Sequence, residues 1–310
     1  MQLKNILASA VLASFALIGQ AQAMDVAITV DDLPYFGTYE SSSLDNRMQI
    51  AKTMLAAFKK HHITGVYGFV IGAKANDEIS KKILKLWVQS GQLLGNHTYS
   101  HMNLANHSSN EYIADIKKTN LILAQYMESA NYRYFRYPYL SEGDSIEKRN
   151  AVRKYLLDNN YQIAETTLDF WDYEWNEPYS RCLKQQNKEA IEYLQNSYLT
   201  ASVGTISTAH DLSQFLFKRQ IKQIMLLHIG ALDALMLDQV LTNYERRGVK
   251  FISLTEALSD KAYTIDAATT RKSGYTFLNE IRVSRKLPNP LNVSNFYNSI
   301  PEDRLASICR

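Results

Sequence analysis

Residues 25–34 have the sequence DVAITVDDLP, in which an apolar, β-branched run ends directly in two acidic residues. Val, Ile and Thr are enriched in strands, so residues 25–30 are predicted to form a buried strand. Asp31 and Asp32 would then stand at its carboxyl end. Adjacent carboxylates repel each other, so each needs a cation, a donor or a proton. A turn or helix cap before Pro34 accounts more easily for one acid than for both.

The pattern of this first segment repeats along the chain. Short β-branched runs alternate with stretches whose apolar residues recur at spacings of three and four, which is typical of amphipathic helices. Strands separated by such helices predict right-handed β-α-β units and a parallel sheet. We predict an α/β fold, a distorted, incomplete (β/α)7 barrel, although periodicity alone does not exclude an open sheet. The predicted strands are residues 25–30, 65–71, 92–95, 133–137, 161–167, 224–228 and 250–253.

Both ends of the chain depart from this alternation. Residues 1–23 place a lysine before an apolar run and finish with Ala21-Gln22-Ala23, the order of a secretory signal peptide. The alternative, an uncleaved membrane anchor, needs about 18 or more apolar residues, and this run is shorter. We therefore expect an exported protein, periplasmic or secreted, with no stable membrane insertion after cleavage. Residues 24–262 would form the barrel, and residues 263–310, which contain three prolines, an irregular extension packed on it.

The chain has two cysteines, Cys182 and Cys309. Exported proteins meet an oxidising compartment, where two cysteines favour a disulfide. We predict that this bond forms and ties the extension to the barrel. Two separate buried thiols are the alternative, which the spacing does not decide.

The charge of the chain is nearly balanced, with 34 basic and 31 acidic residues. Proteins that bind nucleic acid concentrate Lys and Arg on one face or stripe. Nothing in this sequence suggests such a concentration, so nucleic acid is not an expected partner. The sequence says nothing about the oligomeric state.

Ionisable residues gather at the carboxyl ends of the predicted strands, the face of an α/β barrel where loops converge on one site. His97 and His101 follow the third strand at positions i and i+4, so both could face one ion if the segment is helical. Two histidines and one carboxylate leave positions open for water and substrate, as a hydrolytic metal centre requires. A structural pair of hydrogen-bonded histidines is the alternative for this spacing alone.

Five segments, taken in order, resemble the five motifs of the polysaccharide deacetylases (carbohydrate esterase family 4, the NodB-homology domain). They are Thr29-Val30-Asp31-Asp32, His97-Thr98-Tyr99-Ser100-His101, Arg136-Tyr137-Pro138-Tyr139, Asp169-Phe170-Trp171-Asp172 and Leu226-Leu227-His228. Order and spacing agree over residues 25–255. The resemblance implies a hydrolase that removes N-acetyl groups from an acetylated sugar polymer, whether peptidoglycan, a chitin-type oligomer or an exopolysaccharide.

The resemblance also implies a metal and a substrate pocket. A divalent ion, zinc by preference and otherwise cobalt or nickel, would be held by Asp32, His97 and His101. Residues of the third to fifth motifs would bind the substrate: Pro138, Leu226 and Trp171. Most leucines that end an apolar strand fill the core, and this is the alternative for Leu226.

The same resemblance implies the proton carriers. Asp31 would be the general base, held in place by Arg136. His228 would be the general acid, kept protonated by Asp172, because an amine leaves poorly without a proton. The backbone N–H of Tyr139 would stabilise the oxyanion.

The chain departs from the family pattern at Leu33 and Leu140, where glycine is usual or frequent, and at Tyr173, which replaces a tryptophan. None of these is a predicted ligand or proton carrier, so they bear on pocket shape and substrate. Other readings are an O-acetyl esterase or a cyclic-amide hydrolase on the same fold, or a non-catalytic glycan-binding envelope protein. The presence of both Asp31 and His228 favours an enzyme.

Overall fold

The computed structural model describes residues 24–37, 44–128 and 133–310, so the predicted signal peptide lies outside the described residues. Parallel strands form one seven-stranded sheet in the order β5-β4-β3-β2-β1-β6, with β7 paired to β1. Each strand predicted from the sequence is present, although β4 and β5 are only two residues long. The strands are β1 (Met24–Leu33), β2 (Tyr67–Val70), β3 (Leu93–Asn96), β4 (Tyr134–Phe135), β5 (Gln162–Ile163), β6 (Gln223–His228) and β7 (Val249–Ile252).

The sheet curls around β1, which pairs with three strands. Val26 and Ala27 pair with both β6 and β7, so these two strands lie on opposite edges of β1. β2 shares the edge of β7 and pairs with the second half of β1. The chain beyond β5 returns to β6, where Leu168 pairs in parallel with Met225. The predicted distorted, incomplete barrel is therefore confirmed.

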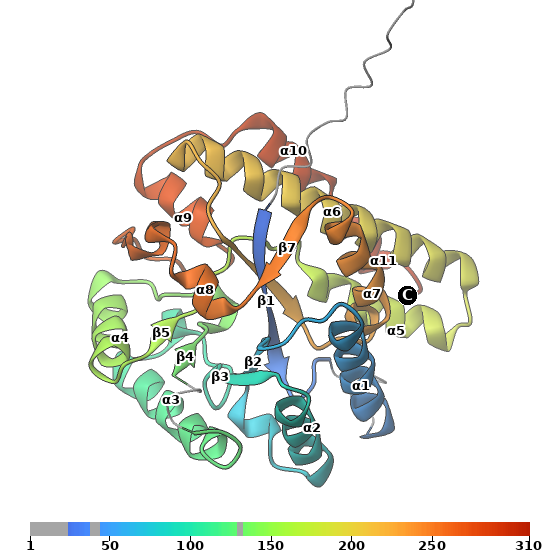
Figure 1. The fold of residues 1–310 in the computed structure, drawn as a ribbon, viewed down its shortest axis with the longest axis horizontal. Coiled ribbons are helices and arrows are strands. Elements are labelled where there is room, and N and C mark those ends of the chain that lie inside the picture. Colours follow the sequence, from blue (N-terminus) through green and yellow to red (C-terminus); the bar gives the residue numbers. More distant parts are fainter. Residues whose placement is uncertain (1–23, 38–43, 129–132) are drawn as a thin grey trace, which may run out of the picture.

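Helices surround the strands (Figure 1). Residues close in sequence cap the helix starts. Ser108 and Glu111 form a capping box at the start of α3, and the side chain of Asp77 caps α2. In the described ranges, no helix combines the length and the apolarity needed to cross a membrane. The helices of the barrel region are α1 (Leu44–Lys60), α2 (Glu78–Gln89), α3 (Ser109–Leu123), α4 (Ile146–Asp158), α5 (Asn176–Lys184), α6 (Lys188–Phe217), α7 (Ala231–Glu245) and α8 (Leu254–Leu258).

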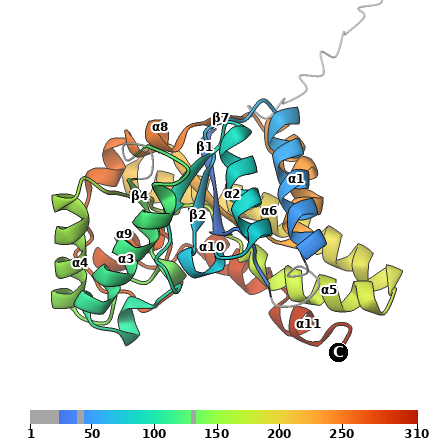
Figure 2. The ribbon, with the colours of Figure 1, turned by 90° about the horizontal axis from the view of Figure 1, so that it is seen from below.

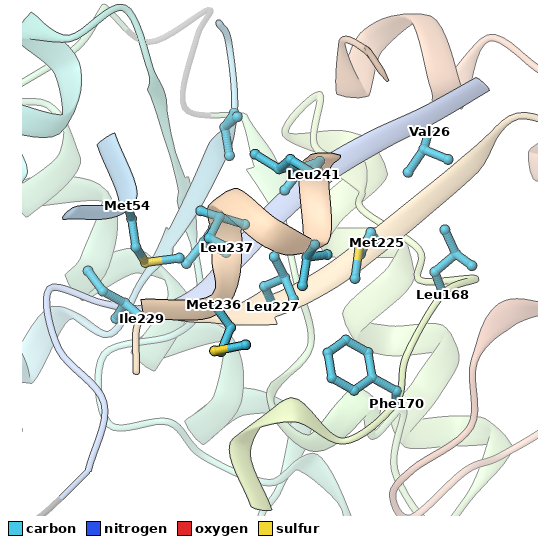
Figure 3. Packing of buried hydrophobic residues seen from close by; sticks show 14 of the residues in the cluster. Val26, Met54, Leu168, Phe170, Met225, Leu227, Ile229, Met236, Leu237 and Leu241 are labelled. Atoms are coloured by element: carbon cyan, nitrogen blue, oxygen red, sulfur yellow. The ribbon is translucent and has the colours of Figure 1, made fainter. Parts of the chain in front are cut away.

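Apolar side chains fill both the barrel interior and the layer between strands and helices. Along β6, Ile224 belongs to the interior cluster, whereas Met225 and Leu227 belong to the outer one. Figure 3 shows these two side chains near Leu237 and Leu241 of α7. Burying each such side chain stabilises the fold by roughly 1.5–3 kcal/mol. This packing fixes β6, and with it the residue that ends the strand.

The C-terminal extension is more regular than the sequence predicts. It contains α9 (Phe277–Ser284), α10 (Leu291–Ser299) and α11 (Glu302–Ser307). Two of its prolines immediately precede helices, because Pro290 and Pro301 occupy the N-cap positions of α10 and α11. A proline there sacrifices no intrahelical hydrogen bond. The prolines thus mark the starts of short helices, where we expected irregular chain. The domain boundary at residue 262 stays a prediction.

The predicted disulfide is confirmed, since Cys182 of α5 is bonded to Cys309. Figure 2 shows α11 and the C-terminus beside α5. Polar contacts reinforce the link: Arg181 donates to the carbonyl of Leu305 at 2.9 Å, and Gln185 donates to that of Cys309 at 3.0 Å. The alternative of two separate buried thiols is wrong.

Removal of this bond should lower stability substantially. It joins residues 127 positions apart, a loop for which the chain-entropy model gives about 4–5 kcal/mol. We expect the Cys182→Ser/Cys309→Ser double variant to unfold at a lower urea concentration, and a reductant to shift the wild type alone. Circular dichroism across a urea series measures both. If the reductant did not change the urea midpoint of the wild type, the disulfide would not have the stabilising role that we expect.

Candidate active site

The carboxyl ends of the strands surround one cavity of about 460 Å³. Eight of the residues predicted for the site line it: Asp31, Asp32, His97, His101, Tyr139, Trp171, Leu226 and His228. Arg136 and Asp172 are buried behind this lining and contact it. Pro138 is buried and is not among the lining residues. The five sequence segments therefore converge on one place.

Asp31 and Asp32 both face the cavity, although successive residues of a strand normally point to opposite sides. The backbone of Asp32 lies in the left-handed region, with φ = 69°, and this breaks the alternation. Such a conformation costs a non-glycine residue about 1–3 kcal/mol and persists only where its surroundings enforce it. Both carboxylates are buried, and Oδ1 of each has no hydrogen-bond partner among the described residues. Unpartnered buried carboxylate oxygens suit a cation.

Two imidazoles approach one of these oxygens. Nε2 of His97 lies 3.5 Å from Oδ1 of Asp32, and Nε2 of His101 lies 3.4 Å from it. The three ligand atoms are within 4.8 Å of one another. Nδ1 of His97 is 2.8 Å from the carbonyl oxygen of Arg136, so Nδ1 carries the hydrogen and Nε2 keeps its lone pair. The donor set, two imidazoles and one carboxylate, fits a divalent metal with open positions.

The segment that carries the histidines is not helical, contrary to the condition attached to their spacing. Thr98 and His101 have left-handed φ angles of 60° and 56°. Asn96 accepts a hydrogen bond from the backbone N–H of Thr98 at 2.9 Å, and the Thr98 hydroxyl accepts one from Met102 at 3.1 Å. A tight turn held by side chains, rather than one helical turn, brings the two rings together.

The surroundings favour the metal-binding protonation states. Burial lowers the pKa of His101 to about 3, so its imidazole is neutral. Burial alone would raise the pKa of Asp32, but Lys74 and His97 hold it well below its usual value. Nζ of Lys74 lies 3.7 Å from Oδ2 of Asp32. Lys74 was not predicted from the sequence: it ends a short 3₁₀ helix after β2 (Gly72–Lys74) that carries no recognisable motif.

Arg136 reaches the site from inside the barrel. Its guanidinium donates to the carbonyl of Ala164 at 2.7 Å and to the hydroxyl of Thr29 at 2.9 Å. Its third nitrogen lies 3.5 Å from Oδ2 of Asp31. One buried cation therefore connects β1, the end of β4 and the segment after β5, and it faces the carboxylate of Asp31.

His228, at the end of β6, is paired with Asp172. The two side chains meet at 2.9 Å through Nδ1, and the backbone N–H of His228 donates to the second carboxylate oxygen at 2.6 Å. Burial opposes a charge on the imidazole, but the carboxylate of Asp172 outweighs it and raises the pKa of His228 to about 10. The ring lies 5.3 Å from each of the rings of Phe36 and Tyr173. The imidazole is therefore cationic at neutral pH.

Asp233 is a buried acid near Asp172 that the sequence did not lead us to predict. Burial, followed by the charge of Asp172, raises the pKa of Asp233 well above its usual value. Tyr198 donates to one oxygen of Asp233 at 2.6 Å, and Asn176 donates to the other at 2.7 Å. The signal was an acid within the apolar first turn of α7, in the sequence ALDALM. Asp169, which lines the cavity, was likewise given no role, and burial raises its pKa to about 6.

The remaining predicted residues shape the cavity wall. Tyr139 and Leu140 are left-handed, with φ of 59° and 50°. The ring of Tyr139 lies 4.5 Å from that of His101, and the side chain is half exposed. Leu226 is buried at the cavity, and Trp171 packs on Tyr297 of α10 at 5.3 Å. Ser273 and Gly274 of the extension also line the cavity, which no local pattern indicated.

Part of this chain is similar in sequence to known proteins. Residues 19–162 match the family model described as Polysaccharide deacetylase. This match, over slightly less than half of the chain, identifies a polysaccharide deacetylase domain in these residues. It is 25% identical over 236 residues to a chitin deacetylase of Arthroderma benhamiae, covering 76% of this chain and 52% of that protein. It is 29% identical over 161 residues to a peptidoglycan-N-acetylglucosamine deacetylase of Bacillus cereus, covering 52% and 50%.

The chain spans about half the length of these curated relatives. Its fold is similar to that of a carbohydrate esterase family 4 pseudoenzyme from Bacillus anthracis. The TM-score is 0.51 at 19% identity, over 77% of this chain and 66% of the other. A likeness at this identity concerns the fold alone, so activity has to be argued from the side chains.

The two neighbouring aspartates should differ in metal binding. Asp32→Asn removes a charged ligand oxygen and should lower the metal content of protein dialysed against limiting zinc. Asp31→Asn is the matched control and should retain the metal, because none of the three ligand atoms changes. Elemental analysis of both purified variants makes the comparison. Loss of metal from Asp31→Asn with retention by Asp32→Asn would reverse the two assignments.

Proposed function

We propose that the protein is a metal-dependent hydrolase that removes N-acetyl groups from an acetylated sugar polymer. The observation that carries this is one cavity lined by a metal-type donor set, a carboxylate outside that set, and a cationic imidazole. The two curated relatives are named for deacetylating chitin and peptidoglycan N-acetylglucosamine. These names support an N-acetylated glycan as the substrate class.

Asp32, His97 and His101 would hold the cation, zinc by preference and otherwise cobalt or nickel. When bound, such an ion supplies a Lewis acid for the acetyl carbonyl and acidifies a water molecule. Asp31 would accept the proton of the attacking water, and Arg136 would keep that carboxylate in place.

His228 would donate a proton to the departing nitrogen, and Asp172 would keep it protonated and oriented. The backbone N–H of Tyr139 would stabilise the oxyanion. Leu226 would contact the acetyl methyl group and Trp171 the sugar, since both line the cavity. Pro138 would act through the loop that it begins.

Two observations weigh against the other readings. One alternative is a non-catalytic binding protein, since one structural neighbour is a pseudoenzyme. Such a protein would be expected to lack the base or the acid, whereas Asp31 and His228 both line the cavity here. An ester releases an alcohol more readily than an amide releases an amine. The dedicated pair of His228 with the buried Asp172 therefore favours an amide substrate over an O-acetyl ester.

We also propose that the protein works outside the cytoplasm, in the periplasm or after secretion. The disulfide between Cys182 and Cys309 supports this, because such bonds persist in oxidising compartments.

The proposal predicts acetate release from an N-acetylated glycan. Chitin oligomers, peptidoglycan and an N-acetylated exopolysaccharide should be compared with acetylated xylan as the O-acetyl control. Prolonged chelation should abolish the release, and zinc, cobalt or nickel should restore it. Asp31→Asn should slow it by about 10²–10⁴-fold, the usual effect of a positioned proton acceptor. Full activity of rigorously metal-free protein would contradict the metal-dependent mechanism.

The pH profile tests the general acid. If the reaction needs protonated His228, activity should persist at pH values below the His228 pKa of about 10 and be lost as the pH rises through that value. Asp172→Asn removes the attraction and leaves the burial, so the alkaline limb of kcat should move to lower pH. Asp169→Asn is the control, because Asp169 bonds the backbone of Trp171 and should shift the limb less. An unchanged limb in an active Asp172→Asn variant would argue against this pairing.

A further inference from the structure

A loop of the C-terminal extension, residues 271–275, lies along the loop that follows β4. We call these the extension loop and the β4 loop, the latter being residues 138–143. Arg271 forms an antiparallel bridge with Gly143, and the backbone carbonyl of Arg271 accepts a hydrogen bond from the backbone N–H of Glu142 at 2.9 Å. The two loops are thus joined by backbone hydrogen bonds, and residues of both line the cavity.

Further along, the extension loop contacts the residue proposed to bind the oxyanion. The backbone N–H of Gly274 donates to the carbonyl oxygen of Tyr139 at 3.0 Å. Tyr139 and Leu140 both hold left-handed backbone, which requires support from the surroundings. Part of that support comes from a segment more than 130 residues further along the chain.

The side chain of Arg271 fixes the extension loop in place. Its guanidinium lies 2.5 Å from a carboxylate oxygen of Glu142 and 3.1 Å from one of Glu165. It also lies 3.1 Å from Glu280 of α9. The arginine and the three acids are all buried or nearly so. Arg153 adds a second cation to Glu142 at 2.6 Å, so guanidinium groups neutralise this acidic cluster.

We propose that the extension loop is a sugar-binding wall of the active-site cavity and that Arg271 positions the β4 loop through it. The nature of the ligand rests on the proposed function: it is a pyranose ring of the N-acetylated glycan. Ser273 is an exposed residue that lines the cavity, and a serine hydroxyl can form a hydrogen bond with a sugar hydroxyl. Arg271 does not line the cavity and acts on the reaction only through its neighbours.

Direct binding tests the wall. Ser273→Tyr would place a ring in the cavity, and Ser299→Tyr makes the same change at an exposed position of α10. Both are made in the Asp31→Asn background, so that intact oligosaccharides can be titrated by calorimetry. With N-acetylglucosamine tetramer and acetylated peptidoglycan fragments as probes, we expect Ser273→Tyr to weaken binding by about 10- to 200-fold. Ser299→Tyr should bind like its parent.

The outcomes separate this inference from the proposed function. Equal affinity in the two tyrosine variants, or no binding of any probe to the parent, contradicts the wall. Binding that depends on Ser273, in a protein whose wild type releases no acetate, contradicts the hydrolase proposal and leaves the wall standing.

A kinetic comparison tests the positioning role. Arg271→Lys keeps the charge but loses the fork that spans three acids, and we expect kcat to fall by about tenfold or more with metal content unchanged. Arg219→Lys is the control, because Arg219 makes a similar two-point contact with Asp260 away from the cavity. A purely structural role would lower the melting temperature in both variants and kcat in neither.

Gly274→Ala gives a second route to the same answer. An added Cβ meets no atom within 4 Å, but the φ of +76° strains it. We therefore expect the loop to shift without any direct contact between the new methyl group and the ion cluster. We expect the same loss of kcat. Wild-type kcat in this variant, or in folded Arg271→Lys, contradicts the positioning role.

Discussion

Asp31 and Asp32 repel each other at the end of β1, where both are buried and both face the same cavity. Their surroundings resolve the repulsion by giving each carboxylate a different partner. Arg136 approaches Asp31 from the barrel interior, while two imidazoles and Lys74 surround Asp32. Chemically identical side chains thereby acquire different surroundings, one beside a guanidinium and the other beside two imidazoles and an ammonium group. The left-handed backbone of Asp32 makes this arrangement geometrically available.

The strand that carries these acids is the best supported of the sheet. β1 pairs with β2, β6 and β7, and β6 brings His228 into register with Asp31. Parallel strands place their carboxyl ends at one edge, so residues far apart in sequence meet without long loops. Burial lowers the pKa of His101, whereas at His228 the effect of burial is outweighed by Asp172, which raises the pKa.

Much of the fold was predictable because its signals are local. β-branched runs identified every strand, including β4 and β5, and five short motifs identified the groups around the cavity. The curling of the sheet was not readable, since Leu168 meets Met225 only in three dimensions. The turn at His97 was missed because left-handed φ angles in Thr98 and His101 leave no compositional trace. Lys74, Asp233 and Ser273 were missed for a different reason, because each makes its contacts with residues that are distant in sequence.

The pairing of the extension loop with the β4 loop also sets an order of events in time. Ribosomes make chains from the N-terminus, so β1 and both histidines exist long before residues 271–275 do. A chain that has emerged only as far as β7 therefore lacks Ser273, Gly274 and Arg271, one of the cations that contact Glu142 and Glu165. The cavity cannot be complete until residues 271–275 have been synthesised. The aspartates and histidines of the cavity are thus made first, and their cavity is closed only when residues 271–275 pack beside them.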